Sequence, residues 1–458
     1  MNAERPAAGH DRASSRLFHC EHAWLGGSTP TADVLIDTAE GRITAVSTGT
    51  AAPPGAKRLP GLTLPGLVNT HSHVFHRAIR GRTHSGAADF WKWRALMYAV
   101  AERLGPDTMY ALARATYAEM ALSGVTAVGE FHYLHAGPGG SPYADPNAMG
   151  AAVIRAANDA GLRITLLDTC YLQSDVFGAP LTGVQQRFGD GSWQAWAERV
   201  DLLKPAAGVR IGAAIHSVRA VPRTALSPVA EYARSRHLPL HAHVSEQPAE
   251  NRATAQAYGT TPTDLLAAEG VLGATTTAVH ATHLSDADIE LLGASRTSVS
   301  MCCTTERDLA DGIGPAVRLA RAGSPLCVGS DSQAVIDLWE EARAIELHER
   351  LVSGERGHLR GEDLAGALTA NGADSIGWDA GRIAPDALAD LVTVRLDSPR
   401  TAGAGAGDLL TATLFAATSA DVTTVVVGGR VIVDDGRHCL VPDVGGALAA
   451  AIAVCFDD

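Results

Sequence analysis

Several features that would identify other classes of protein are missing from this sequence. It contains no run of Lys and Arg residues, and its formal net charge is −13, so a nucleic-acid partner is not expected. It also contains no apolar run long enough to span a bilayer, and its polar start, residues 1–16, lacks a signal-peptide core. We therefore expect no membrane association and a cytoplasmic location.

Cysteine is scarce and scattered, which argues against a disulfide framework. The seven cysteines form no CxxC pair, so a zinc site built from thiolates is not expected either. What is present fits a folded enzyme: 46% of the 458 residues are hydrophobic, 19% are charged and 47 are glycine. A chain of this length usually exceeds one hydrophobic core, which suggests a large domain and a smaller one.

Between residues 66 and 380, short apolar runs alternate with longer helical patterns, as in repeated βα units. Eight such runs are predicted strands, and they end near residues 71, 131, 168, 215, 244, 280, 301 and 329. Eight parallel strands are the number that closes a (β/α)₈ TIM barrel of the α/β class. The same alternation is also compatible with a doubly wound open sheet, so periodicity alone does not decide between the two folds.

Two further groups of predicted strands lie near the ends of the chain. Residues 17–25, 32–36 and 41–46 form one group, and residues 391–394 and 422–433, rich in β-branched side chains, form the other. We expect both groups to meet in one small β-sandwich domain. The predicted division is residues 1–65 and 381–458 for the two parts of this sandwich and residues 66–380 for the barrel.

Ionisable side chains gather at the ends of four predicted strands, which favours the barrel. The clusters are His-Ser-His at 71–73, His-Ala-His at 241–243 followed by Glu246, His-Ala-Thr-His at 280–283, and Ser-Asp-Ser at 330–332. In a TIM barrel the chemistry gathers at these strand ends. Imidazole nitrogens with one carboxylate suit a divalent ion such as zinc. Any one of these histidines would more often be structural, but four clusters at strand ends indicate a catalytic metal site.

The motifs around these clusters resemble the amidohydrolase superfamily, in its mononuclear deaminase branch. They are Pro65–His73, His243–Glu246, Val279–His283 and Gly329–Asp331, and the resemblance covers nearly the whole chain. Residue by residue, it implies four metal ligands, His71, His73, His243 and Asp331. It also implies proton transfer by Glu246 and His280, with Asp331 orienting the attacking water. One zinc ion per subunit is implied, although Fe²⁺ or Mn²⁺ could occupy the same ligands, and so is a homodimer.

Three further segments are similar to the formimidoylglutamate deiminases within this superfamily. They are Glu130–Tyr133, Ile215–Pro222 and Cys302–Gly312. This narrower resemblance implies that four residues hold the substrate: His76, Tyr133, His216 and Arg219. His76 stands where better-known bacterial relatives carry Gln. Both side chains can donate a hydrogen bond to a carboxylate, but only His can also gain a charge near neutral pH.

The activity that the resemblance implies is hydrolytic deimination of N-formimino-L-glutamate to N-formyl-L-glutamate and ammonia. The partner is then a small molecule carrying carboxylates, for which the planar guanidinium of Arg219 is a natural clamp. Another hydrolase of the same branch, acting on an aminopurine, cytosine or guanidino substrate, stays open as an alternative. A non-catalytic scaffold is disfavoured, because Glu246 and His280 are both retained beside a full ligand set.

Two groups of acidic residues receive no decisive interpretation from the sequence. Glu306 and Asp311 could either cap a helix or line the pocket. The run formed by Asp337, Glu340 and Glu341 is interpreted as a solvated helix face.

Overall fold

The larger sheet consists of eight parallel strands in the computed structural model, which describes residues 16–84 and 90–456. The strands are β5 (Leu67–Ser72), β6 (Val125–His132), β7 (Arg163–Cys170), β8 (Val209–Ile215), β9 (Leu240–Val244), β10 (Thr276–His280), β11 (Ser298–Met301) and β12 (Leu326–Val328). They pair in chain order from β5 to β12, and nearly all of their residues are buried. Such continuous burial is typical of parallel sheets that helices cover.

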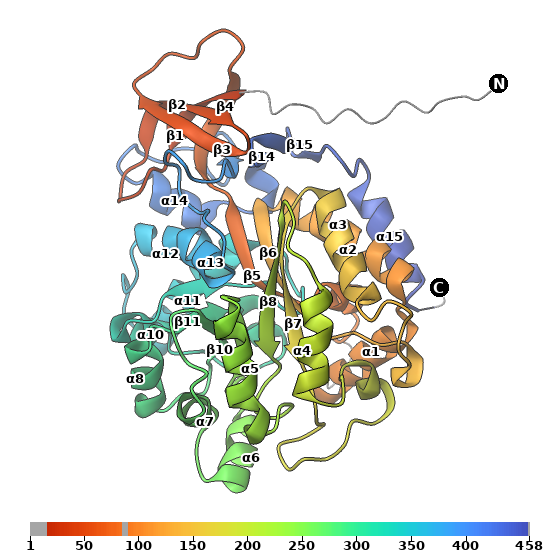
Figure 1. Cartoon of the computed structure of the whole chain (residues 1–458). Coiled ribbons are helices and arrows are strands. Elements are labelled where there is room, and N and C mark those ends of the chain that lie inside the picture. Colours follow the sequence, from red (N-terminus) through yellow and green to blue (C-terminus); the bar gives the residue numbers. More distant parts are fainter. Residues whose placement is uncertain (1–15, 85–89, 457–458) are drawn as a thin grey trace, which may run out of the picture.

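Helices alternate with these strands and cover the outside of the sheet (Figure 1). They are α1 (Phe90–Arg103), α2 (Pro106–Leu122), α3 (Ala148–Ala160), α4 (Trp193–Leu202), α5 (Arg223–Ser235), α6 (Pro248–Tyr258), α7 (Pro262–Ala268), α8 (Asp286–Ala294), α9 (Cys303–Asp308), α10 (Ala316–Ala322), α11 (Leu338–Ser353), α12 (Gly361–Leu368) and α13 (Ala370–Ser375). Short 3₁₀ helices are η1 (Val74–Ile79), η2 (Pro138–Gly140), η3 (Gly183–Arg187) and η4 (Ser419–Asp421). Gly161 and Gly323 adopt the left-handed conformation that ends α3 and α10.

The barrel closes where β5 meets the chain that follows β12. An isolated parallel bridge joins Ser72 to Asp331 at this seam, with backbone hydrogen bonds of 3.0 Å from Asp331 N to His71 O and from His73 N to Asp331 O. A doubly wound sheet reverses its strand order part-way, whereas this sheet keeps chain order throughout. The predicted (β/α)₈ barrel is therefore confirmed, and the open sheet is excluded.

The terminal strands form a second, mixed sheet. Its order is β16-β15-β14-β13-β4-β1-β2-β3. The strands are β1 (Arg16–Ala23), β2 (Thr31–Ala39), β3 (Arg42–Thr48), β4 (Lys57–Pro65), β13 (Leu391–Val394), β14 (Val422–Val427), β15 (Arg430–Asp434) and β16 (Arg437–His438). The two ends of the chain join where β4 pairs antiparallel with β13, Pro65 facing Leu391. The predicted β domain built from both termini is confirmed in this form.

The terminal sheet lies at one end of the barrel, where β4 leads directly into β5 (Figure 1). Helices α14 (Leu409–Ala416) and α15 (Val444–Ala453) belong to the C-terminal part of the chain, and α15 packs against α2. Residues 1–15 of the predicted segment 1–65, which include most of the polar start, lie outside the described residues. Within the described ranges, no helix is both long and apolar enough to cross a membrane.

The acidic run at the start of α11 differs from its prediction. Asp337 caps the helix, since its carboxylate accepts hydrogen bonds from the backbone N–H groups of Trp339 and Glu340. Glu341 is fully buried and accepts hydrogen bonds from the backbone N–H and the hydroxyl of Thr304. The interpretation of this run as a solvated face was wrong, because two of its carboxylates satisfy backbone donors inside the fold.

Candidate metal centre and substrate pocket

Three histidines and one aspartate converge at the C-terminal ends of the barrel strands. His243 Nε2 lies 3.2 Å from His71 Nε2 and 3.3 Å from His73 Nε2. Asp331 Oδ1 lies 3.3 Å from His71 Nε2 and 3.4 Å from His73 Nε2. Around a tetrahedral zinc ion with bonds of about 2.0–2.1 Å, ligand atoms are about 3.3 Å apart. The donor types and the spacing of this group therefore fit such an ion.

Hydrogen bonds on the far side of two imidazole rings orient their Nε2 atoms toward this group. His73 Nδ1 lies 2.9 Å from the carbonyl oxygen of Phe131, and His243 Nδ1 lies 2.7 Å from that of His216. A carbonyl oxygen only accepts, so each Nδ1 carries the proton and each Nε2 presents a lone pair. Burial lowers the pKa of His71 to about 3 and the pKa of His243 well below its ordinary value. Neutral imidazoles are the form that binds a metal.

His280 lies beside the group at longer distances. Its Nε2 is 3.9 Å from Asp331 Oδ2 and 3.9 Å from Glu246 Oε1. Ligand atoms of His71, His243, His280 and Asp331 also lie within 4.8 Å of one another, so His280 could replace His73 in a looser set. The set with His73 is tighter, and its spacing matches a tetrahedral ion. His280 is thus better placed to face a molecule bound at the metal.

Carboxylates surround His280 and favour its charged form. Burial opposes that charge, but Glu246, Glu306 and Asp331 outweigh it and raise the pKa of His280 to about 10. Glu306 approaches the other side of the ring, 3.5 Å from Nδ1, and also accepts a hydrogen bond of 3.0 Å from the backbone N–H of Cys302. The sequence left capping and pocket roles open for Glu306. In the structure its carboxylate accepts from the N–H of Cys302, the residue before α9, and also contacts His280.

Two histidines of the sequence clusters lie outside this group. His241 Nε2 lies 2.9 Å from the carbonyl oxygen of Ser375, the last residue of α13. His283 contacts the backbone oxygen of Asp311 at 2.7 Å. The side chain of Asp311 accepts a hydrogen bond from Gln247 and is buried. Each of the two histidines thus has a backbone partner away from the metal group.

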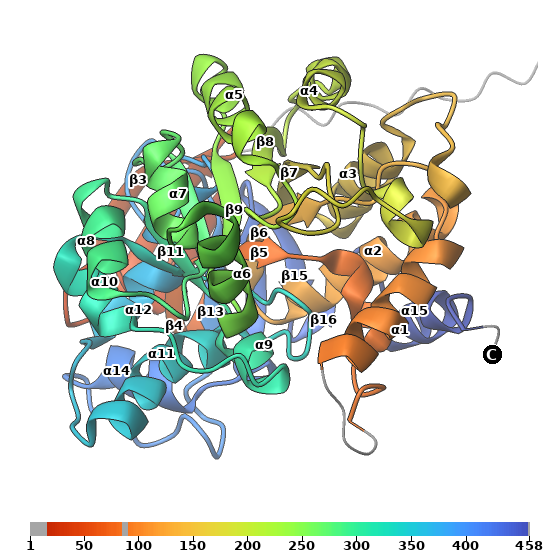
Figure 2. The same cartoon turned by 90° about the horizontal axis from the view of Figure 1, so that it is seen from below.

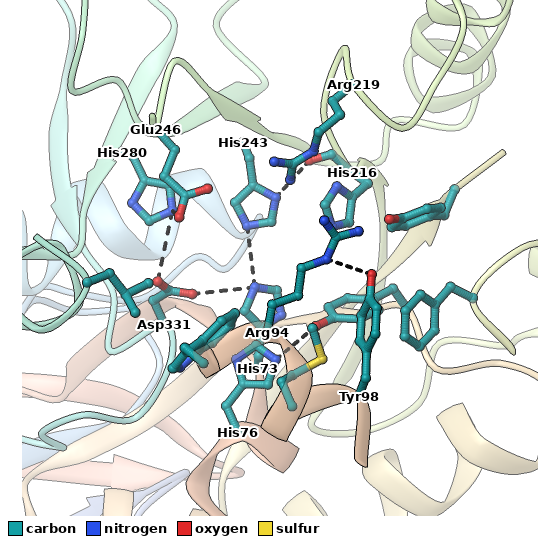
Figure 3. A pocket seen from close by; sticks show the side chains of 16 residues that line it. His73, His76, Arg94, Tyr98, His216, Arg219, His243, Glu246, His280 and Asp331 are labelled. Atoms are coloured by element: carbon teal, nitrogen blue, oxygen red, sulfur yellow. Dashed lines mark hydrogen bonds and ion pairs between the residues drawn. The ribbon is translucent and has the colours of Figure 1, made fainter. Parts of the chain in front are cut away.

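A pocket opens next to the metal group, at the barrel end seen in Figure 2. All four predicted substrate residues line it, together with residues from α1 and from the loops after β7 and β11. The lining residues are His73, His76, Trp93, Arg94, Met97, Tyr98, Tyr133, Tyr171, Phe188, His216, Arg219, His243, Glu246, His280, Leu309 and Asp331. Aromatic rings thus form much of the wall. The charged groups in it are the guanidinium groups of Arg94 and Arg219 and the carboxylates of Glu246 and Asp331 (Figure 3).

His76 and Tyr133 form one polar pair in this wall. The Tyr133 hydroxyl lies 2.8 Å from His76 Nε2, and both residues are buried. His76 Nδ1 is buried without a hydrogen-bond partner among the described residues. Burial lowers the pKa of His76 well below its ordinary value, so its ring is neutral at physiological pH. It can therefore donate or accept one hydrogen bond in the pocket but does not supply a charge.

Two guanidinium groups supply the positive charge instead. Arg219 follows β8, and no ion pair of its guanidinium is found within the described part of the chain. Arg94 comes from α1, and its Nε donates a hydrogen bond of 2.8 Å to the hydroxyl of Tyr98. In Figure 3 both side chains approach the pocket on the side of His216, away from Asp331 and His280. The pocket therefore has a cationic side and a metal-binding side.

Comparison with known proteins places this site in a family. The model of the amidohydrolase family matches residues 62–432. The chain belongs to the amidohydrolase family. The formimidoylglutamate deiminase of Pseudomonas aeruginosa is 36% identical to it over 397 residues, which are 84% of this chain and 87% of that protein. The 5-methylthioadenosine/S-adenosylhomocysteine deaminase of Natronomonas pharaonis is 29% identical over 410 residues, covering 88% and 89% of the two chains.

Solved structures agree with this assignment. The crystal structure of an amidohydrolase from Brucella melitensis superposes with a TM-score of 0.86 and 30% sequence identity, over 96% of this chain and 99% of that one. This amidohydrolase is therefore a metal-dependent hydrolase of C–N bonds with a buried site of three histidines and one aspartate.

One wall of the pocket was not predicted from the sequence of this amidohydrolase. Helix α1 contributes Trp93, Arg94, Met97 and Tyr98, and none of them follows a barrel strand directly. A weak signal exists, because Arg94 and Tyr98 are four residues apart and so lie on the same helical face. That spacing is common on helix surfaces, and it does not by itself distinguish a binding residue from a solvent-exposed one.

Proposed function

We propose that this amidohydrolase is a zinc-dependent deiminase that converts N-formimino-L-glutamate and water to N-formyl-L-glutamate and ammonia. The observation that carries the proposal is the pair of arginines, Arg94 and Arg219, opposite the metal group in one pocket. The substrate carries two carboxylates, one on the α-carbon and one at the end of the side chain, and a formimino group on its nitrogen. The 36% identity to the formimidoylglutamate deiminase of Pseudomonas aeruginosa supports the same substrate.

The two arginines would bind the two carboxylates and leave the formimino carbon near the metal group. Guanidinium groups bind carboxylates through paired hydrogen bonds and stay charged throughout the physiological range. Tyr133 and His216 would complete this half of the site, and His76 would donate one neutral hydrogen bond. Because such contacts hold the substrate in a reactive orientation, part of the barrier is removed before any bond changes.

His71, His73, His243 and Asp331 would hold the zinc ion. When bound, zinc polarises the reacting group and lowers the pKa of a water molecule to about 7. Asp331 has a further role open to it, because its Oδ1 faces the histidines and its Oδ2 lies 3.9 Å from His280 Nε2. Its second oxygen can therefore orient the attacking water toward the formimino carbon.

Glu246 would transfer protons, and His280 would stabilise the charge that develops during the reaction. Glu246 accepts a proton from the attacking water and returns it to the terminal nitrogen of the formimino group. The remaining hydroxyl proton follows to the same nitrogen as the C–N bond breaks, so that ammonia leaves and the carbon becomes the formyl carbonyl. His280 Nε2 donates a hydrogen bond to the oxygen atom that adds to the formimino carbon. This hydrogen bond stabilises the charge that develops on that oxygen. The 3.9 Å between His280 Nε2 and Glu246 Oε1 lets both side chains reach one bound molecule.

The choice of leaving group separates this reaction from its closest competitor. Protonation of the terminal nitrogen releases ammonia, whereas protonation of the glutamate nitrogen would release formamide and glutamate. The test is to incubate the purified, zinc-loaded protein with N-formimino-L-glutamate and to identify the products by mass. Ammonia with N-formylglutamate supports the proposal, and either formamide or the absence of turnover contradicts it.

The family resemblance also leads us to propose a homodimer with one zinc ion per subunit. Light scattering during gel filtration measures the mass of the particle, and metal analysis of the same fraction gives the ratio of zinc to chain. A particle of one chain mass, 47.5 kDa, would contradict the dimer but not the activity.

A further inference from the structure

The seam between β5 and β12 carries most of the candidate metal centre. His71 and His73 lie on the β5 side of this seam, and Asp331 lies on the β12 side. Among the described residues, backbone pairing across it is limited to the isolated bridge between Ser72 and Asp331, whereas β7 and β8 form a continuous ladder. The spacing of three metal ligands thus depends on a junction with few backbone hydrogen bonds.

The two sides of the seam approach each other closely. A Cβ atom added to Gly329 would lie 2.7 Å from His71 Cβ and 2.8 Å from His71 O, so only glycine fits at this position. The chain beyond it is strained, because Asp331 and Gln333 have φ angles of 42° and 62°. Such left-handed conformations of non-glycine residues are unfavourable and persist only where the surroundings hold them in place.

A chain of buried side-chain hydrogen bonds crosses the seam and supplies that support. At Asn69, Nδ2 donates to Ser330 Oγ at 2.7 Å, and Oδ1 accepts from Ser330 N at 3.0 Å. Ser330 Oγ then donates to Gln333 Oε1 at 2.8 Å. All three residues have a relative exposure of 0%. The loop that carries Asp331 is therefore tied to β5 at Asn69, two residues before His71.

Gln333 continues the chain back to β5. Its Nε2 donates to Ser72 Oγ at 2.9 Å and to the backbone oxygen of Asp331 at 3.0 Å. Ser72 Oγ in turn donates to Glu130 Oε2 at 2.7 Å, and Glu130 Oε1 accepts from the backbone N–H of Val74 at 2.7 Å. In this arrangement the hydroxyls of Ser330 and Ser72 each accept one hydrogen bond and donate one, which connects Asn69 with the carboxyl group of Glu130.

We propose that Gln333 is a positioning residue of the metal centre, which spans the seam and fixes Asp331 against the two β5 histidines. Within this hydrogen-bonded series of described residues, its amide contacts both Ser72, which lies between His71 and His73, and the backbone of Asp331. The inference rests on the metal site of the proposed function but not on its substrate. Partners of this kind behind metal ligands typically change metal affinity or activity by about 10- to 100-fold when they are replaced.

The test is the zinc affinity of Gln333→Met, measured by competition with a chromophoric chelator. Methionine keeps the length of the side chain and removes both polar ends of the amide. We expect zinc binding to weaken by about 10- to 100-fold. At saturating zinc, kcat should fall while KM for the substrate changes little, because Gln333 does not line the pocket. Unchanged zinc affinity in this variant would overturn the proposal.

A matched control separates positioning from a general loss of stability. Asn371 Nδ2 donates to the backbone oxygen of Leu326 at 2.9 Å, at the opposite end of β12. Asn371→Leu should lower Tm without weakening zinc binding. If its zinc affinity falls as much as that of Gln333→Met, the effect is not specific to the seam and the proposal fails.

A second variant keeps the test decisive if Gln333→Met does not fold. Ser72→Ala removes one hydroxyl from the same chain, and it should also weaken zinc binding. When both variants fold, their losses of zinc binding free energy should be clearly less than additive in the double variant, because they break one network. Additive losses would contradict a shared role. Failure of the unmodified protein to bind zinc would overturn the proposed metal site as well, which distinguishes the two claims.

Discussion

Replacing Arg94 by Met should raise KM for N-formimino-L-glutamate by about 10- to 150-fold and leave kcat within a few-fold of the original value. A hydrogen bond to a charged group contributes about 1.5–3 kcal/mol, and about 1.4 kcal/mol corresponds to a factor of ten. Arg94 belongs to α1 and approaches the pocket away from Glu246 and His280, so its loss should affect binding more than proton transfer.

The size of the effect should depend on which carboxylate the substrate carries. N-formimino-4-aminobutanoate lacks the α-carboxylate, and the N-formimino derivative of L-2-aminobutyrate lacks the γ-carboxylate. With Arg94→Met, one of these analogues should retain the kcat/KM that it has with the unmodified enzyme, because its missing carboxylate is the partner of Arg94. The second analogue should lose as much as the full substrate does. This pattern assigns one carboxylate to Arg94 and leaves the other to Arg219.

Two further variants calibrate this prediction. Tyr98→Phe removes only the hydroxyl that accepts from Arg94 Nε, so it should raise KM less than the loss of the guanidinium does. Arg155→Met removes an exposed guanidinium that lies over the ring of Tyr110, 4.3 Å from its centroid, and should not alter KM. The reasoning is refuted if Arg94→Met leaves KM unchanged for all three compounds, or if it lowers kcat equally for all of them.

Glu246→Gln should keep one zinc ion per chain and lower kcat by about 10²- to 10⁴-fold, the usual contribution of a general acid–base, and near-normal turnover would contradict its proton-transfer role. Removal of metal by a chelator should abolish ammonia release and lower Tm, and zinc should restore both, with about 4 kcal/mol of stabilisation at free zinc 1,000-fold above Kd. The third prediction concerns acid stability. Burial opposes the charge of Asp168, but Arg199 holds its pKa at about 2, below its ordinary value. The stabilisation by this pair should therefore be complete above about pH 5 and be lost as the pH falls toward 2. Urea unfolding should show this loss, and Asp168→Asn should remove it while costing about 3–5 kcal/mol at neutral pH.

The positions of the candidate metal ligands could be predicted from the sequence because they lie at or just after the ends of strands. His71, His243 and Asp331 each lie within three residues of a barrel strand end. Since parallel strands place their carboxyl ends at one edge, chain position fixes the approximate place of these side chains. Strand position alone does not separate His280 from His283, which contacts the backbone of Asp311 in the structure.

Other features depend on tertiary contacts that no local pattern encodes. Arg94 reaches the pocket from a helix that follows no strand, so its place depends on how α1 packs. Glu341 has the sequence context of an exposed helical residue. In the structure it is buried, and its carboxylate accepts hydrogen bonds from the backbone N–H and the hydroxyl of Thr304. Gln333 and Ser72 are 261 positions apart, and their hydrogen bond exists only because the barrel closes. Hydrogen bonds between distant residues follow from the completed fold.

The central claim is that the pocket selects an acyclic dicarboxylate and not a purine. It is tested most directly by measuring kcat/KM of the zinc-loaded enzyme for N-formimino-L-glutamate and for 5-methylthioadenosine under the same conditions. The account predicts efficient release of ammonia from the first compound and little from the second, because the two arginines would face no anion of the nucleoside. A higher kcat/KM for 5-methylthioadenosine would contradict the account.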